Sequence, residues 1–366
     1  MKYYCTSCDK HWSYPIKRCI FCGNQTQEVV ETDYSIIGYT QVHVPSKEHE
    51  KVPYFDYLLE DSNGNRVVKK SYDRYQIGDR IPLEKTQERN NAIVGVVGSG
   101  LLGFDIAECL LRFSYPTVIK TRSKQNADKL TKRMTARLSK NGTPDQVSSY
   151  LSNLRITTDY RNLEACDIVI EAVPEDLEIK KRVFKMLSET CLKKTVFATN
   201  TSSLSIDELS ESSDRPQKCI GMHFFNPVSR MDLVEVVLGR RTSVTTKTQI
   251  VRLSLSLKKK PIVVKDSPGF IVNRLLMPQI NEAVELLENK VATKEDIDAA
   301  VKMGLNHPMG PLTLADLIGI DTCVVILETL YRELGSEWYK PKKLLYGMVK
   351  NGTLGRKTGQ GFYKYP

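Results

Sequence analysis

The sequence predicts an α/β fold, a doubly wound sheet of the Rossmann type with an all-α C-terminal domain, behind a short cysteine-rich ribbon and a small OB-type β-barrel. Three observations lead to this fold class. Two CxxC pairs stand at the start of the chain, a strand, a glycine-rich turn and an apolar helix follow one another near residue 98, and helical periodicity prevails beyond residue 266. The expected domains are residues 1–25, 26–88, 89–267 and 268–366.

The composition is that of an ordinary water-soluble protein, with 41% hydrophobic and 26% charged residues in a chain of 366. No apolar run approaches the roughly 20 residues of a membrane span, and the first residues do not resemble a signal peptide. We therefore expect a cytoplasmic protein without a membrane partner. The net charge of +10 lies beyond residue 88, because residues 1–88 hold 12 Lys and Arg against 13 Asp and Glu. A basic main domain suits nucleotide ligands, or is simply well solvated.

Four cysteines near the N-terminus form a candidate metal site. "CTSC" and "CIFC" supply Cys5, Cys8, Cys19 and Cys22. Four thiolates in two such pairs make a closed tetrahedral zinc site without a position for water, so the zinc would be structural. The alternative, two disulfides, fits a cytosolic protein poorly. Residues 1–25 are therefore expected to be a zinc ribbon, and the five later cysteines to be reduced thiols.

Residues 26–88 contain several short strand patterns separated by turn signals, such as "YSIIGYTQVHV", "SNGN" and "YQIGDRI". About five strands in this length predict an OB-type barrel. A zinc ribbon followed by such a barrel resembles the modules that accompany thiolases and bind acyl-CoA. Across all proteins, zinc ribbons and OB barrels more often bind nucleic acid, but the net charge of about −1 on residues 1–88 argues against that here. The resemblance implies docking on a thiolase, and deletion of 1–88 is expected to weaken that association while leaving turnover intact.

The glycine-rich turn predicts a dinucleotide site. "AIVGVV" is a buried strand, and Gly98, Gly100 and Gly103 form GxGxxG at the start of an apolar helix. The first glycine permits the tight turn, the second lets a pyrophosphate approach the backbone, and the third allows close helix–strand packing. Leu101 and Leu102 open the helix, whose N-terminal amides face the phosphate.

The next strand ends in "Thr121-Arg122-Ser123-Lys124", where a NAD site normally has an acid that binds the ribose hydroxyls. An acid would repel a 2′-phosphate, whereas Arg122, Ser123 and Lys124 could bind one. This favours NADP over NAD. The alternative is that the acid is simply absent and Lys124 begins a solvated helix. Most cations of the following helix, including Lys129, Lys132 and Arg133, are expected to be solvated, although one or two could meet a CoA phosphate.

Later strands bring polar residues to the same edge of the sheet. "CDIVIEAVPEDLEIKK" places Glu171, Glu175 and Lys180 at or beyond a strand end, and "TVFATNTSSL" delivers Asn200, Thr201, Ser202 and Ser203. Ligands of doubly wound sheets bind at that edge. The serines could also cap the helix that begins near "IDELS".

"GMHFFNPVSRMDLVEVV" places His223 at the end of another strand, and a return strand brings back Glu235. Strand-end histidines are often structural, but this one stands beside a predicted dinucleotide site. Dehydrogenation of an alcohol needs a base with a pKa near neutrality, and a carboxylate on the other ring nitrogen would fix the tautomer.

Residues 91–366 resemble the short-chain L-3-hydroxyacyl-CoA dehydrogenase family. The motifs are "GSGLLG", "EAVPEDLEIKK", "NTSSL", "GMHFFNPVSRMDLVEVV", "DSPGFIVNRLL", "HPMGPLTLADLIGID" and "GRKTGQGFY". The resemblance implies that His223 is the catalytic base with Glu235 as its partner, that Ser202 and Asn273 bind the substrate oxygens, and that Asn226 supports the histidine loop. It also implies cofactor contacts from Glu175, Lys180 and Asn200.

Beyond residue 266, apolar residues of "PGFIVNRLLMPQINEAVELLENK" share one helical face, with a kink expected at Pro278. In the family, such a domain closes the substrate cleft and forms a homodimer. The sequence thus predicts a dehydrogenase that interconverts 3-hydroxyacyl-CoA and 3-oxoacyl-CoA with NADP or NAD. The alternatives are a dehydrogenase of a non-CoA hydroxyacid on the same fold, and a non-catalytic scaffold for acyl-CoA or nucleic acid.

Overall fold

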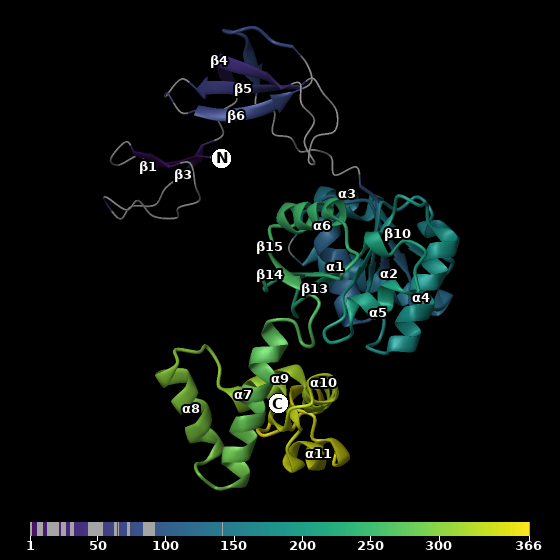
Figure 1. The fold of residues 1–366 in the computed structure, drawn as a ribbon, viewed down its shortest axis with the longest axis vertical. Helices are drawn as coiled ribbons and strands as arrows, with labels where there is room; N and C mark the ends of the chain where they lie inside the picture. The colour runs from purple at the N-terminus through teal and green to yellow at the C-terminus, as the bar shows by residue number, and fades with distance from the viewer. Residues whose placement is uncertain are drawn as a thin grey trace. The chain divides into compact units, whose positions relative to one another are not determined.

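The chain divides into two compact units, Met1–Arg89 and Asn90–Pro366, in a computed structural model (Figure 1). The structure describes residues 2–5, 10–12, 22, 27–29, 33–42, 54–61, 64, 66–71, 74–82, 92–140 and 142–365.

The described strands of the first unit form two antiparallel sheets. One has the order β2-β1-β3, and the other has the order β6-β5-β4-β7. Their bounds are β1 Lys2–Cys5, β2 Lys10–Trp12, β3 Gln27–Val29, β4 Asp33–Val42, β5 Tyr54–Asp61, β6 Arg66–Ser71 and β7 Arg80–Pro82. In the second sheet Ile36, Phe55, Tyr57 and Leu59 form a small buried cluster. The expected strands are present, whereas closure into an OB barrel stays a prediction.

An eight-stranded sheet forms the centre of the second unit, with the order β10-β9-β8-β11-β12-β13-β14-β15. The bounds are β8 Val94–Val97, β9 Thr117–Lys120, β10 Leu154–Thr157, β11 Ile168–Glu171, β12 Val196–Thr199, β13 Cys219–Phe224, β14 Leu233–Leu238 and β15 Lys260–Lys265. All neighbours are parallel except β13 and β14. The strand order reverses beside β8, and ligands bind at such a switch point in doubly wound sheets.

Two apolar layers cover the two faces of this sheet because alternate side chains of each strand point in opposite directions. Val94 and Val96 of β8 belong to one buried cluster, and Val97 belongs to the other. The helices of this region are α1 Leu101–Arg112, α2 Lys124–Ser139, α3 Pro144–Ser152, α4 Leu177–Thr190, α5 Ile206–Ser210 and α6 Val244–Ser256. Short 3-10 turns are η1 Tyr160–Leu163 and η2 Pro216–Lys218. The predicted doubly wound sheet is confirmed.

One helix cap differs from the expectation. Ser202 and Ser203 were candidates for capping the helix at "IDELS" or for binding substrate, but the N-cap of α5 is Ser205, whose hydroxyl accepts a hydrogen bond from the amide of Glu208. An N-cap directly precedes the first helical turn, and Ser202 and Ser203 lie two to three residues before Ser205. Their hydroxyls instead donate hydrogen bonds to Glu175.

The remaining helices pack into an all-α region, as predicted. They are α7 Val272–Glu288, α8 Lys294–Gly304, α9 Pro311–Ile318, α10 Ile320–Leu334 and α11 Lys343–Lys350, with turns η3 Glu337–Tyr339 and η4 Arg356–Thr358. The predicted face of α7 is confirmed, since Ile280 and Val284 are buried and Leu276 and Leu287 pack against the same cluster. Helix α7 continues through Pro278.

Asp316 ties the C-terminal segment to this helical core. Its carboxylate is buried and accepts hydrogen bonds from the amides of Phe362 and Tyr363 and from the hydroxyl of Tyr365, each at 2.9 Å. A Cβ on Gly361 would lie 1.9 Å from this carboxylate, so only glycine allows the close approach.

We expect Asp316→Ala to lower the free energy of unfolding of the helical domain by about 3 kcal/mol, because buried donors left without an acceptor cost about 1–3 kcal/mol each. Denaturant unfolding followed by the fluorescence of Trp338, which lies in this domain, measures the change. The control is Asp321→Ala, which removes a partly exposed ion pair with Lys357 and should cost under about 1 kcal/mol. Equal losses in the two variants would contradict the assignment.

Candidate active site

The glycine turn between β8 and α1 has the geometry that the sequence predicts. Gly98 has a φ of 120°, and a Cβ there would lie 2.3 Å from the carbonyl oxygen of Ala172. A Cβ on Gly103 would lie 2.3 Å from the carbonyl oxygen of Gly98, whereas a Cβ on Gly100 would meet nothing within 4 Å. The first and third glycines thus allow close packing, and the second faces open space. A pyrophosphate fits there, at the N-terminus of α1.

A cavity of about 510 Å³ lies beside this turn. Its lining includes six of the predicted cofactor residues, Gly98, Gly100, Leu101, Leu102, Thr121 and Arg122. On its other side lie Lys120, Tyr160, Arg182 and the apolar residues of α4. The other five predicted cofactor residues, which are Gly103, Ser123, Glu175, Lys180 and Asn200, do not line it. The structure therefore separates the predicted cofactor residues into a group at this cavity and a group elsewhere on the rim.

The end of β9 carries polar and basic side chains. Thr121 is buried, and its hydroxyl forms a 2.8 Å hydrogen bond with that of Ser99. Arg122 is exposed, and the Ser123 hydroxyl caps α2 by accepting from the amide of Asn126. The ammonium of Lys120 lies 4.1 Å from the Tyr160 ring centroid. Burial and the charge of Arg122 lower the pKa of Lys120.

Lys180 is enclosed rather than exposed to a ligand. Its ammonium donates to both carboxylate oxygens of Glu171, at 2.8 and 2.9 Å, and lies 3.4 Å from the carbonyl oxygen of Val173. Glu175 lies 3.3 Å away, and the Thr199 hydroxyl donates to Glu171 at 2.6 Å. Sequence reasoning did not find this network, since nine residues separate Glu171 from Lys180 and no local periodicity pairs them.

Glu175 organises the "NTSS" turn after β12. Its Oε1 accepts hydrogen bonds from the hydroxyls of Thr201, Ser202 and Ser203, and from the amides of Ser202 and Ser203, at 2.6–3.2 Å. Burial alone would raise the pKa of Glu175, but Lys180 and these hydrogen bonds outweigh it, so the pKa lies below its ordinary value. A charged carboxylate therefore holds the turn.

His223 and Glu235 are direct partners on the antiparallel strands β13 and β14. The imidazole Nδ1 lies 2.8 Å from Oε2 of Glu235, and both side chains are buried. Phe225 and Phe270 flank the imidazole, with ring centroids 4.5 and 5.8 Å away.

The second oxygen of Glu235 accepts hydrogen bonds from the amides of Ile271 and Val272, at 3.0 and 3.1 Å. Burial raises the pKa of Glu235, but the bond to His223 and the bonds from these two amides lower it by more. The pKa of Glu235 therefore lies below its ordinary value. The carboxylate is therefore charged at neutral pH, Nδ1 of His223 donates to it, and Nε2 remains for other chemistry.

Two asparagines connect the strands of the site. Asn273, in the first turn of α7, donates through its amide to the carbonyl oxygen of Ser202 at 3.1 Å. The side-chain oxygen of Asn200 accepts from the amide of Phe224, next to His223, at 2.9 Å. Asn226 is exposed in the loop after β13. Asn273 thus links α7 to the "NTSS" turn, and Asn200 links that turn to β13, the strand of His223. Asn200 was predicted to contact the cofactor, whereas its side-chain oxygen binds a backbone amide of the protein.

The four predicted zinc ligands lie only partly within the residues that the structure describes. Cys8 and Cys19 lie outside the described residues, Cys5 is described only as part of β1, and Cys22 is exposed. Within the described ranges, no group of three or more His, Cys, Asp or Glu could hold a metal ion. The five later cysteines are free and buried, as expected for reduced thiols: Cys109, Cys166, Cys191, Cys219 and Cys323.

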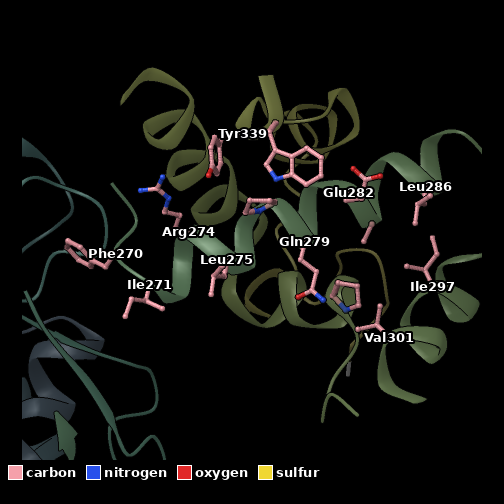
Figure 2. Close-up of a pocket in the computed structure, with 14 residues that line it drawn as sticks. Phe270, Ile271, Arg274, Leu275, Gln279, Glu282, Leu286, Ile297, Val301 and Tyr339 are labelled. Carbon is pink, nitrogen blue, oxygen red and sulfur yellow. The ribbon is translucent and has the colours of Figure 1, made fainter. Parts of the chain in front are cut away.

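A second cavity, of about 680 Å³, lies along α7. Figure 2 shows its side chains coming from α7, from α8, which carries Ile297 and Val301, and from Tyr339 of η3. The lining is mostly apolar, and His223, Glu235 and Asn273 are not part of it. Leu275 is 72% exposed and Trp338 is 59% exposed at its edge.

In the described part of the chain, no helix has the length and apolar character needed to cross a membrane.

Comparison with known proteins shows the family to which the chain belongs. Residues 93–267 match the family model of the 3-hydroxyacyl-CoA dehydrogenase NAD binding domain, and residues 269–365 match that of the C-terminal domain. The 3-hydroxybutyryl-CoA dehydrogenase of Clostridioides difficile is 46% identical over 280 residues, covering 74% of this chain and 99% of the relative. The human mitochondrial hydroxyacyl-coenzyme A dehydrogenase is 39% identical over 286 residues, covering 74% and 90%.

Solved structures give the same result. FadB2 of M. tuberculosis has a TM-score of 0.73 at 36% identity, with 75% of this chain and 100% of that chain covered. The (S)-3-hydroxybutyryl-CoA dehydrogenase PaaH1 of Ralstonia eutropha has a TM-score of 0.72 at 41% identity, with 75% and 99% covered. The chain therefore belongs to the 3-hydroxyacyl-CoA dehydrogenase family and is a nicotinamide-dependent oxidoreductase.

Proposed function

We propose that the protein interconverts a 3-oxoacyl-CoA and the matching 3-hydroxyacyl-CoA, with His223 as the acid–base residue. The observation that carries this proposal is the 2.8 Å bond between His223 and a buried, charged Glu235. The pair occurs in a chain whose glycine turn fits a dinucleotide. Relatives named for 3-hydroxybutyryl-CoA support a short acyl chain.

A nicotinamide cofactor held at the glycine turn of Gly98 and Gly100 would supply hydride-transfer chemistry at the 3-keto carbon in either direction. His223 supplies the proton: in reduction, Nε2 of the imidazolium donates to the carbonyl oxygen, and in oxidation the neutral Nε2 removes the hydroxyl proton. Glu235 stabilises the imidazolium through Nδ1 and fixes its orientation. One hydride and one proton together convert the ketone to the alcohol.

Ser202 and Asn273 are proposed to polarise the substrate carbonyl. Both side chains are already oriented within the protein, since the Ser202 hydroxyl lies 3.1 Å from Glu175 and one N–H of Asn273 donates to the Ser202 carbonyl. The second N–H of the Asn273 amide remains as a donor. Such preorganised donors stabilise a developing oxyanion by a few kcal/mol when water is excluded. Glu175 and Lys180 hold the turn that carries Ser202, and Asn226 would support the histidine loop.

The proposed cofactor is NADP(H) rather than NAD(H). Thr121 occupies the position where a NAD site has an acid, and Arg122 lines the cavity beside the glycine turn. A side chain without negative charge removes the repulsion that a 2′-phosphate would meet.

A second copy of the chain is proposed to cover the apolar cavity along α7, giving a homodimer. Several exposed apolar side chains, such as Ile271 and Leu275, cluster along this cavity. On the surface of a monomer, exposed apolar side chains are normally scattered singly. Five buried free thiols agree with the reducing environment of a cytoplasmic location.

The N-terminal unit is proposed to be a zinc ribbon with an OB-type barrel that binds acyl-CoA and docks on a thiolase. The described antiparallel strands of residues 33–82 agree with a small β module. Deleting 1–88 should weaken co-purification with a thiolase and leave turnover of free substrate unchanged. An unaffected association would exclude docking through this unit.

We expect His223→Gln to lower kcat for acetoacetyl-CoA reduction by about 10²–10⁴, because glutamine cannot transfer the proton. KM values should change little, since the side chain is of similar size. The exposed His307 provides the control, because His307→Gln makes the same change away from the site. Near-normal turnover of the His223 variant would exclude the proposed role.

Glu235 should also make stability depend on pH. Its pKa is lower in the folded protein than the ordinary 4.5, so its contribution to stability is complete above that value and is lost as the pH falls through the folded-state pKa. We therefore expect the difference in Tm between the wild type and Glu235→Gln to be largest near pH 7 and to shrink below about pH 4.5. Thermal melts from pH 7 to 3.5 measure it, with exposed Glu189→Gln as control. A difference that does not vary with pH would show that the charge is not what stabilises the fold.

A further inference from the structure

A third cavity, of about 260 Å³, lies beside the 510 Å³ cavity at the glycine turn and shares Arg122 with it. Its polar lining consists of Ser99, Gly100, Arg122, Asn126, Lys129 and Arg133. Ser99, Gly100 and Arg122 also line the 510 Å³ cavity at the glycine turn. The two cavities are therefore neighbours that share the residues between them.

One face of α2 supplies the outer wall. Asn126, Lys129, Leu130 and Arg133 stand at positions i, i+3, i+4 and i+7, which share a helix face. Leu130 is buried in the core and fixes this face toward the turn. Lys129 and Arg133 are exposed, as expected for solvated cations, and they also line this cavity, whereas Lys132 on another face does not.

The cavity is strongly basic. Three of its side chains are cations and none is acidic. The guanidinium of Arg133 lies 3.9 Å from the Phe104 ring centroid, and Arg137, one turn later, makes the ion pairs with Asp105 and Glu108. Within residues 92–140 and 142–365, no ion pair involves Arg122, Lys129 or Arg133. The charge of Arg133 acts on the carboxyl of Asp105, but within these ranges none of these three cations forms a salt bridge with a carboxylate.

We infer that this cavity binds the 2′-phosphate of the adenosine ribose of NADP(H), held by Arg122, Lys129 and Arg133. The inference rests on the proposed use of a nicotinamide cofactor. A pyrophosphate at Gly100 and a ribose at the end of β9 bring the 2′ position to Arg122. Arginine binds phosphate through paired hydrogen bonds, and the amides at the N-terminus of α2 add a favourable dipole.

The 3′-phosphate of CoA has the same chemistry, a phosphomonoester on an adenosine ribose. The shared lining with the glycine turn favours the dinucleotide, because that turn is where its pyrophosphate binds. The proposed site therefore accounts for Lys129 and Arg133 without assigning them to the substrate.

The test compares Lys129→Gln, Arg133→Gln and the double variant with Lys132→Gln as the matched control on α2. Each loss of a charged contact should raise KM for NADPH about tenfold, and the double variant about a hundredfold, with KM for NADH within about twofold of the wild type. Calorimetry with 2′-AMP should show binding to the wild type and the control and none to the double variant, while melting curves confirm folding.

Two results would overturn the inference. One is an unchanged ratio of NADPH to NADH efficiency in the double variant. The other is a raised KM for acetoacetyl-CoA, but not for acetoacetyl-dephospho-CoA, at constant KM for NADPH, which would assign the cavity to CoA. Because 2′-AMP binding needs neither His223 nor an acyl-CoA, failure of the proposed reaction would leave the calorimetric test of this cavity standing.

Discussion

The carboxylate of Glu235 is the interaction on which the site depends. One oxygen binds Nδ1 of His223, and the other accepts from the amides of Ile271 and Val272, where α7 begins. A single buried charge thus orients the proposed proton-transfer group and fastens the helical domain to the sheet. Three hydrogen bonds, from the imidazole and the two amides, offset the cost of burying this charge. Removing it would leave both the imidazole and two backbone amides without their partner.

A second buried charge network carries the serine turn. Glu171 and Lys180 are almost inaccessible to water, and Glu175 joins them to Ser202 and Ser203. A buried ion pair of this kind is weak evidence for net stability, because the desolvation cost offsets much of the attraction. Its value here is geometric: the charges fix the turn between β12 and α5 in one conformation.

The sequence could predict the parts of the fold and site that follow from local pattern. The glycine spacing predicted the turn at Gly98, short apolar runs predicted the buried strands, and the strand return predicted that Glu235 would reach His223. Contacts between distant elements were less accessible. The pairing of Glu171 with Lys180 depends on the start of α4 relative to β11. The cavity at Lys129 and Arg133 depends on the rotation of α2, which is set by the burial of Leu130 and Met134. Periodicity placed the apolar face correctly but could not say which neighbouring residues flank the glycine turn.

The one antiparallel pairing in the large sheet explains why the catalytic pair forms at all. In a parallel pair the carboxyl ends of the two strands lie side by side, so that the last residue of β11, Glu171, is paired with the last residue of β12, Thr199. Reversal between β13 and β14 instead puts the third residue of β14 opposite the fifth residue of β13, so His223 near the end of one strand meets Glu235 in the other. Opposite residues of an antiparallel pair have Cβ atoms about 5 Å apart, close enough for an imidazole and a carboxylate to bond directly. A shift of one residue in this register would turn one side chain to the opposite face. The chemistry therefore rests on the register between β13 and β14, which pairs His223 with Glu235.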